Sequence, residues 1–296
     1  MAERIVKKAT EPTLGMSDLA EFWLGDLASA GRSEATVRSY GYAVLSYTRS
    51  QGEELPSRTS VRQWLAGERN RSAVSRHLYF TGLNMFCKWM VHEGYLADNP
   101  MTGLPRPKVE VTPVKPFSGD EVDGMIRACR GISFTSARDR LIVRMLAVTG
   151  LRLHELAAIR VADIDRGNQV ISVVGKGSKH RPVPYDRLAA RDLITYTIFR
   201  RKHKDAASPY LLLGKKGRLG PKGIDLVVRK RAAMAGVDDA HAHRFRHTHA
   251  TDWLSKGGGE SALMNTMGWS SGAMLRRYTA HRAGELAQAE FKRLYG

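Results

Sequence analysis

The sequence predicts a mainly α-helical protein with a small antiparallel β-sheet, in which an N-terminal helical bundle precedes a mixed α/β domain. Three observations support this prediction. Apolar residues recur at helical spacing over most of the 296 residues. A β-branched run at residues 169–174 is followed by a glycine-containing turn and a second short run at 180–184, as in a β-hairpin. Five prolines between residues 100 and 116 separate the two halves.

Residues 1–16 are polar and are expected to form a flexible tail, so that the helical domain spans residues 17–98. Serine and threonine favour helix N-caps because their side-chain oxygens accept a backbone N–H. They mark the expected starts of four helices: Ser17, Ser33, Thr59 or Ser60, and Ser72. The aromatic stripes of these helices are interpreted as core. Arginines near the start of the fourth helix fit either a phosphate contact or a solvated surface.

The proline-rich residues 99–116 cannot form a regular helix and are expected to be an extended linker. The second domain then spans residues 117–296 and begins with a capping box from Ser118 to Glu121. Pro182 and Pro184 place the second hairpin strand at a sheet edge. Further helices are expected at these ranges: 137–149, a stretch after Gly150, 187–203, 222–235, 241–251, 260–267 and 284–294.

The charge of the chain favours a polyanionic partner. The 47 Lys and Arg residues exceed the 29 Asp and Glu residues, giving a formal net charge of +18. Residues 1–100 hold 12 basic and 11 acidic residues, whereas residues 101–296 hold 35 basic and 18 acidic residues. Such a concentration of basic residues in one domain points first to nucleic acid.

The two cysteines, Cys87 and Cys129, lie in apolar helical patterns and are interpreted as buried thiols without a disulfide. We find no apolar run long enough for a membrane span and no signal peptide. The sequence is therefore expected to be that of an intracellular protein with no membrane partner.

Residues 241–251 (HAHRFRHTHAT) form the most informative stretch. His243 and Arg246 are three residues apart and should share one helix face. A guanidinium offers a planar fork of donors for phosphate oxygens, and an imidazole can donate or accept a proton near neutral pH. Two alternatives stay open at this point, namely a solvated basic face and a metal site that uses the four histidines.

Five motifs in order resemble those of the tyrosine recombinases, the phage integrase and Xer-like family. Thr149-Gly-Leu-Arg152 with Glu155 is similar to the first arginine box, and His243-x-x-Arg246 to the second. The other matches are Lys176 in the hairpin turn, Gly268-Trp269-Ser-Ser and Tyr278. The resemblance covers about residues 17–296. It implies a SAM-like core-binding domain for the helical bundle and a tyrosine-recombinase catalytic domain for the rest.

The resemblance implies that Tyr278 attacks a DNA phosphodiester, forms a 3′-phosphotyrosine and releases a 5′ hydroxyl. Arg152 and Arg246 would stabilise the charge that develops on the phosphate oxygens. Lys176 would protonate the leaving oxygen, and His243 would accept the tyrosine proton or hold a phosphate oxygen. The bond energy is kept in the phosphotyrosine, so no cofactor and no metal is expected.

Trp269 stands where the family usually has histidine, and indole donates a hydrogen bond but accepts no proton. Trp269 could therefore donate to a phosphate oxygen or pack against the nucleophile, but it could not accept a proton. Lys176 is preferred over Lys179 because it follows Arg152 by the spacing typical of Xer-like members and lies at the turn.

The implied partners are double-stranded DNA with a specific core site and further copies of the chain. The C-terminal helix, residues 284–294, is expected to pack on a neighbouring subunit in a tetramer, although packing on its own domain is the alternative. The expected role is phage or mobile-element integration in the cytoplasm. Alternatives are Xer-like dimer resolution, a type IB topoisomerase, a binding-only protein on the same fold and a metal-dependent hydrolase.

Overall fold

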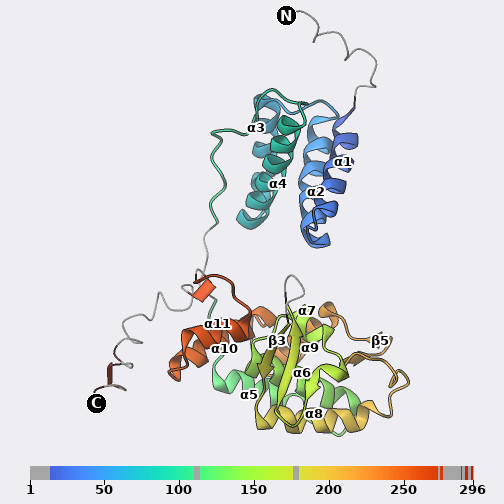
Figure 1. The fold of residues 1–296 in the computed structure, drawn as a ribbon, viewed down its shortest axis with the longest axis vertical. Helices are drawn as coiled ribbons and strands as arrows, with labels where there is room; N and C mark the ends of the chain where they lie inside the picture. The colour runs from blue at the N-terminus through green and yellow to red at the C-terminus, as the bar shows by residue number, and fades with distance from the viewer. Residues whose placement is uncertain are drawn as a thin grey trace, which may run out of the picture. The chain divides into compact units, whose positions relative to one another are not determined.

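The computed structural model describes residues 14–109, 114–175, 180–272, 274–275, 288, 291–292 and 295. The chain divides into two compact units, Met1–Thr112 and Pro113–Gly296, each with a hydrophobic core of its own (Figure 1). Most of the expected tail lies outside the described residues, as do Lys176, Lys179 and Tyr278. The described positions of the expected last helix are helical.

The first unit is a bundle of four α-helices: α1 (Met16–Ser29), α2 (Glu34–Gln51), α3 (Arg58–Gly67) and α4 (Ala73–His92), with a short 3-10 helix, η1 (Glu68–Asn70), before α4. The aromatic stripes form its core, as the sequence predicts: Trp23, Trp64 and Phe86 are at most 2% exposed, and Trp23 packs against Phe86 with ring centroids 5.0 Å apart. Phe22 of α1 is an exception to this prediction, because 53% of its surface is exposed to solvent.

Two expected helix starts in this bundle are wrong. Helix α1 begins at Met16, with Gly15 as its N-cap. Ser17 instead donates its hydroxyl and its backbone N–H to the carboxylate of Glu53, at 2.7 and 2.8 Å, so a contact distant in sequence replaces the local cap. Helix α3 begins one residue after Ser57, which is its N-cap. Ser33 and Ser72 are N-caps as predicted.

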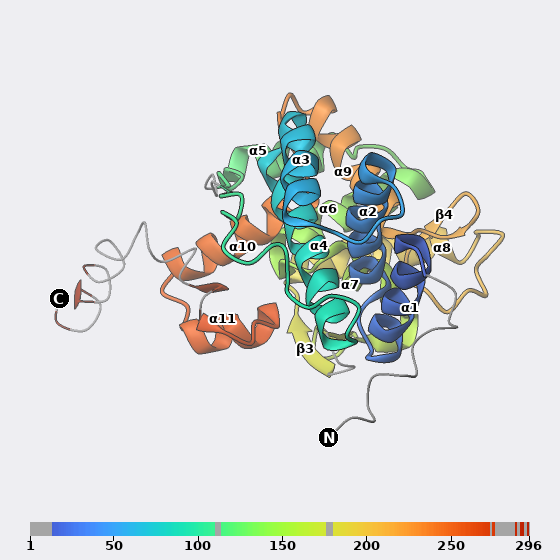
Figure 2. The ribbon, with the colours of Figure 1, turned by 90° about the horizontal axis from the view of Figure 1, so that it is seen from above.

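The second unit arranges its helices around the buried helix α6 (Phe134–Thr149), which packs against α5 (Gly119–Arg127), α8 (Arg187–Arg200), α9 (Pro221–Met234) and α10 (Ala242–Ser255). The short helix α7 (Leu153–Ala158) packs against α9, and α11 (Glu260–Met267) lies beside the sheet (Figures 1 and 2). Five apolar side chains of α6 are fully buried: Leu141, Ile142, Val143, Met145 and Leu146. The Ser118–Glu121 capping box at the start of α5 is confirmed.

The main sheet has three antiparallel strands in the order β1 (Ile164–Asp165), β2 (Val170–Val174) and β3 (His180–Pro184). Strand β3 is at the edge, as its two prolines predict. Ile171 pairs with Val183 and Val174 with His180. A 3-10 helix, η2 (Val161–Asp163), precedes the sheet, and β4 (Leu213–Gly214) pairs with β5 (Gly217–Arg218). The sequence analysis did not anticipate β1, β4 or β5, which are only two residues long.

Both cysteines are buried and unpaired, as predicted. Burial raises the pKa of the Cys87 thiol to about 12 and that of Cys129 to about 11, so both are unreactive at neutral pH. Within the described residues, no helix is long and apolar enough to cross a membrane.

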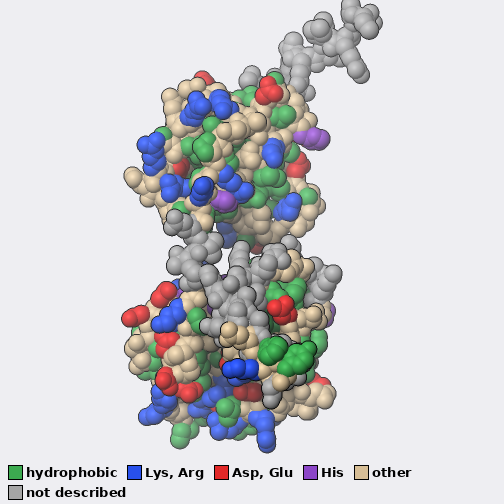
Figure 3. All heavy atoms as spheres, turned by 90° about the vertical axis from the view of Figure 1, so that its left-hand side faces the viewer, with side chains coloured by type: hydrophobic (Ala, Val, Ile, Leu, Met, Phe, Trp, Pro, Cys, Tyr) green, Lys and Arg blue, Asp and Glu red, His purple; other side chains and the backbone are tan. Residues whose placement is uncertain are grey.

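Basic side chains gather on the second unit at the end that carries α8 (Figure 3). Arg187, Arg191 and Arg201 are exposed there. Partly buried arginines of the same unit are instead neutralised by a carboxylate: the buried Asp192 accepts hydrogen bonds from Arg140 and Arg144. The basic surplus of this unit is therefore partly internal and partly on its surface.

Candidate active site

Arg246 is a buried guanidinium that joins two segments distant in sequence. It lies in the second turn of α10 and is 1% exposed. Its Nη1 donates to the carbonyl of Gly150 at 2.8 Å, and its Nη2 donates to the carbonyl of Met267 at 2.5 Å. These bonds fix the plane of the guanidinium between the α6–α7 turn and the end of α11.

The α6–α7 turn depends on a left-handed glycine. Gly150 has φ +59° and ends α6, and a Cβ atom there would lie only 3.0 Å from Met267 Sδ and 3.1 Å from His249 Cδ2. A side chain is therefore excluded by conformation and by space. Because the chain reverses here, the Gly150 carbonyl reaches Arg246 and Arg152 follows at the N-cap of α7.

Arg152 is braced by Glu155, as the sequence suggests. The Arg152 backbone N–H donates to Glu155 Oε2 at 2.9 Å, and its Nη1 donates to Glu155 Oε1 at 3.0 Å. The Arg152 side chain is 39% exposed, whereas that of Glu155 is 8% exposed. One buried carboxylate thus holds a partly exposed guanidinium at the surface.

Glu155 has a second arginine partner that the sequence analysis missed. Arg181, on β3, donates from Nη2 to Glu155 Oε2 at 2.9 Å. Burial by itself would raise the pKa of Glu155, but the hydrogen bonds and charges of Arg181 and Arg152 lower it below the usual value. A signal was present in the sequence: Arg181 is two residues before the buried Val183 and therefore on the same strand face.

His243 and Arg246 differ in exposure although they are one turn apart. His243 is exposed at the start of α10, and its ring centroid lies 5.0 Å from that of His247 in an edge-to-face arrangement. His243 therefore borders the surface beside a buried guanidinium. No group of three His, Cys, Asp or Glu residues in the described part of the chain could hold a metal ion.

Trp269 is packed beside Arg246. It follows Gly268, which has φ +61° and ends α11, and its ring centroid lies 5.4 Å from Arg246 Cζ. The indole is 6% exposed and belongs to a small hydrophobic cluster: Ala250, Leu254, Leu263, Met267, Trp269 and Leu275. Leu275 anchors the chain three residues before Tyr278.

Of the six residues singled out from the sequence, Arg152, Arg246 and Trp269 are brought together through the 150–155 turn and the end of α11. His243 lies at the start of the helix that carries Arg246. Lys176 and Tyr278 lie outside the described residues, as does Lys179. The arrangement presents an arginine and a histidine at a surface, and a second arginine is buried behind a tryptophan.

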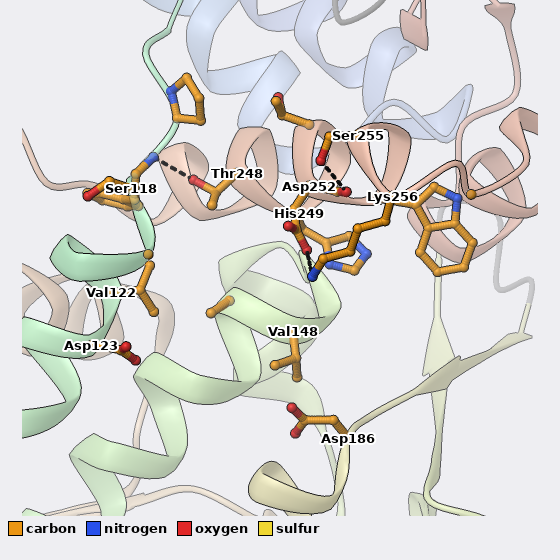
Figure 4. A pocket seen from close by; sticks show the side chains of 17 residues that line it. Ser118, Val122, Asp123, Val148, Asp186, Thr248, His249, Asp252, Ser255 and Lys256 are labelled. Carbon is orange, nitrogen blue, oxygen red and sulfur yellow. Dashed lines mark hydrogen bonds and ion pairs between the residues drawn. The ribbon is translucent and has the colours of Figure 1, made fainter. Parts of the chain in front are cut away.

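A large cavity lies elsewhere on this unit. It has a volume of about 770 Å³ and lies between α5, α6 and α10 (Figure 4). Apolar walls from Phe117, Val122 and Val148 face polar groups that include His249, Asp252 and Lys256. Burial lowers the pKa of His249, and its Nε2 has no hydrogen-bond partner among the described residues. Arg152, Arg246 and Trp269 do not line this cavity.

The comparison with protein families decides the assignment. The model of the phage integrase family matches residues 115–285. This chain is a tyrosine recombinase of the phage integrase family. Such recombinases cleave and rejoin DNA through a tyrosine intermediate and carry out site-specific recombination. The recombinase is 32% identical over 268 residues to tyrosine recombinase XerC of Mycobacterium sp. (strain KMS), covering 84% of this chain and 89% of the relative.

A second XerC, from Mycobacterium tuberculosis (strain ATCC 25177 / H37Ra), is 33% identical over 264 residues with the same coverage. Among solved structures, the recombinase has the fold of XerH bound to a palindromic difH substrate, with a TM-score of 0.74, 17% identity and coverage of 93% and 84% of the two chains. A lambda integrase dimer bound to a COC′ core site gives a TM-score of 0.71, 16% identity and coverage of 88% and 97%. The predicted fold class is confirmed.

Proposed function

We propose that this recombinase cleaves and rejoins duplex DNA at a specific core site, with Tyr278 as the nucleophile and Arg152 and Arg246 as the clamp of the scissile phosphate. The observation that carries the proposal is the bracing of the two arginines through one turn. Arg246 bonds the Gly150 carbonyl and Arg152 follows two residues later, so both guanidinium groups are set by the same backbone.

The chemistry follows from the properties of the side chains. A tyrosine hydroxyl has a pKa near 10 in water and is a weak nucleophile at neutral pH. As the Tyr278 oxygen bonds to phosphorus, the bond from phosphorus to the 5′ oxygen breaks and negative charge builds on the non-bridging oxygens. Two guanidinium groups stabilise that charge, and loss of one such donor typically costs on the order of 10²–10³ in rate.

Two protons must move in this reaction. The tyrosine proton goes to His243, whose exposure at the start of α10 supports this role. The leaving 5′ oxygen takes a proton from Lys176. Each of these general acid and base steps typically contributes a factor of roughly 10²–10⁴ in rate. Trp269 accepts no proton, and its packing beside Arg246 supports a positioning role.

A covalent-adduct assay tests this proposal. Wild type and Tyr278→Phe are incubated with nicked DNA that carries the core site, in EDTA, and are separated on a denaturing gel. We expect a covalent protein–DNA band for wild type and none for Tyr278→Phe. Absence of the band for wild type on DNA that it binds would overturn the proposal.

We further propose that the recombinase assembles as a tetramer on DNA through the helix at residues 284–294. Phe291 supports this, because it is 64% exposed and its ring centroid lies 5.1 Å from that of Tyr295, which is one residue beyond this range and 77% exposed. An exposed aromatic pair is typical of a surface that another chain covers. A lambda integrase tetramer bound to a Holliday junction shares the fold, with a TM-score of 0.70, 16% identity and coverage of 88% and 78%.

Removal of the last helix tests the assembly. A chain that ends at residue 283 is expected to bind a single core half-site but to form no synaptic tetramer, measured by mass photometry on DNA. Phe291→Asp in the full chain should have the same effect. Tetramers formed equally well by both variants would contradict the proposal.

The biological role we propose is integration and excision of a phage or mobile element in the cytoplasm, where its DNA substrate lies. The identity to Mycobacterium XerC recombinases favours dimer resolution as a second candidate. Deletion of the gene from its genome separates the two. Loss of integration with normal chromosome segregation supports the first role, and defective segregation supports the second.

A further inference from the structure

We infer that Arg181 is a positioning residue for DNA cleavage, holding Arg152 in place through Glu155 and tying both to the end of α11. The inference deepens the proposed function and depends on it. Arg181 lies on β3 and is not one of the six catalytic residues expected from the sequence. Its side chain is 12% exposed. Its role is therefore exerted through neighbouring groups and not through contact with DNA.

The contacts of Arg181 reach two different elements. Nη2 donates to Glu155 Oε2 at 2.9 Å, and Nε donates to the carbonyl of Thr266 at 2.9 Å. Glu155 Oε2 also accepts the backbone N–H of Arg152, and Oε1 accepts Arg152 Nη1. One guanidinium on the edge strand thus bonds to the carboxylate that fixes Arg152 and also to α11.

The contacts of Arg246 complete a closed set. Thr266 and Met267 offer consecutive carbonyls at the end of α11, where the carbonyl dipoles favour a cation. Arg181 donates a hydrogen bond to the first carbonyl, and Arg246 donates one to the second. Arg246 also bonds Gly150, two residues before Arg152. The buried guanidinium of Arg246 and the largely buried one of Arg181 therefore connect the same pair of segments, residues 150–155 and 266–267.

The packing around Arg181 leaves little room for movement. A Cβ atom on Gly268 would lie 3.1 Å from the Arg181 Cζ and Nη1 atoms, so the guanidinium rests against this backbone. The next residue is Trp269, whose ring lies over Arg246. A change at Arg181 is therefore transmitted to the turn that positions Trp269 as well as to Arg152.

Electrostatics gives a readout that a purely structural role would not change. Among the described residues, Arg152 and Arg181 are the charged groups that face Glu155. Without Arg181, the cost of burying the Glu155 carboxylate is less well offset. The pKa of Glu155 then rises, so protonation of the carboxylate releases Arg152 at a less acidic pH. As the pH is lowered, a variant without Arg181 should therefore lose cleavage activity at a higher pH than the wild type does.

The test uses full-length wild type, Arg181→Met and Arg181→Lys on the nicked core-site DNA at saturating protein, with single-turnover cleavage rates followed from pH 5.5 to 9. We expect Arg181→Met to bind DNA within about twofold of wild type. Its rate should fall on the order of 10²-fold, the effect of a small misplacement of a catalytic group. The acidic limb of its pH–rate profile should move to higher pH. Arg181→Lys should recover part of the rate and reverse part of the shift in the profile.

A matched control separates positioning from stability. Arg144→Met removes an arginine of this unit that is equally shielded, at 11% exposed, and that bonds Asp192 of α8. It should lower the melting temperature as Arg181→Met does but leave the cleavage rate and pH profile unchanged below that temperature.

If Arg181→Met is too unstable to purify, Glu155→Gln serves in its place and is expected to remove the acidic limb. Cleavage by either variant within twofold of wild type with an unshifted pH profile overturns the inference. Failure of wild type itself to form an adduct counts against the proposed function instead.

Discussion

At the residue scale, the positions of Arg152 and Arg246, the two arginines proposed to act on the phosphate, depend on neighbouring residues that hold them in place. Gly150 reverses the chain in a left-handed conformation, and its carbonyl receives Arg246. Glu155 accepts Arg152 and Arg181 on one buried carboxylate. The reactive groups are therefore fixed by backbone geometry and by a shared anion, and substitutions at those supports should affect catalysis.

Gly150→Ala tests the first support. The left-handed backbone costs an L-residue roughly 1–2 kcal/mol, and the added methyl would contact Met267 and His249. We expect a loss of at least that free energy of unfolding together with slower cleavage, measured by urea denaturation and single-turnover assays.

Gly236→Ala is the matched control, because Gly236 has φ +68° with nothing near its Cβ position. It should lose similar stability and keep its cleavage rate. Equal cleavage by both variants would show that the 150–152 turn does not position the arginines.

Trp269 gives a second prediction at this scale. Trp269→Ala leaves a cavity in the cluster of α10 and α11, and such truncations cost about 3–5 kcal/mol. Trp269→Phe keeps most of the packing and should cost less than half as much. Because indole exchanges no proton, Trp269→Phe should also keep the wild-type pH profile. A pH limb that disappears in Trp269→Phe would contradict the packing role.

At the element scale, the second unit uses buried ion pairs to join helices. Asp139 on α6 accepts Arg138 at 2.7 and 2.9 Å and Arg231 of α9 at 2.7 and 3.0 Å, and its side chain is 2% exposed. Arg231 also donates to the carbonyl of Ala128, at the end of α5. Asp139 and Arg231 thus connect α6, α9 and the end of α5.

Asp139→Ala should be strongly destabilising, because it leaves the buried guanidinium of Arg231 and the largely buried one of Arg138 without their anion. Loss of one partner of such a pair typically costs about 3–5 kcal/mol. The exposed pair of Asp225 and Arg229 is the control, and Asp225→Ala should cost less than about 1 kcal/mol. Chemical denaturation measures both, and similar losses would refute a structural role for the buried pair.

Local patterns predicted most elements but not all of their ends. The Ser118 capping box, the β2–β3 hairpin and its edge position follow from nearby residues alone. The start of α1 does not, because Glu53 takes the hydrogen bonds of Ser17 after the chain has folded back. The sequence analysis gave Arg181 no role for a similar reason: its strand face follows from the sequence, but the segments that this strand meets do not.

At the scale of the whole molecule, the chain combines a nearly neutral first part with a strongly basic second part. Residues 101–296 carry 35 basic and 18 acidic residues, against 12 and 11 in residues 1–100. Each unit has its own core, so charge and fold are both divided between them. The family motifs lie in the basic unit, which is where contact with DNA phosphates is expected to be strongest.

Binding should therefore depend strongly on salt. If six or more phosphates are neutralised, the dissociation constant should rise about 10³-fold or more between 50 and 200 mM salt. The Tyr278→Phe variant allows this to be measured at equilibrium without cleavage. A dissociation constant that does not change with salt would contradict the electrostatic account.

The central claim is that Tyr278 becomes joined to the 3′ phosphate of the cleaved strand. The most direct measurement is mass spectrometry of the trapped adduct after nuclease and trypsin digestion. Because Arg277 and Arg282 flank this stretch, trypsin should release residues 278–282. The account predicts that this peptide carries a nucleotide through its 3′ phosphate. A nucleotide on another residue, or one linked through its 5′ phosphate, would contradict it.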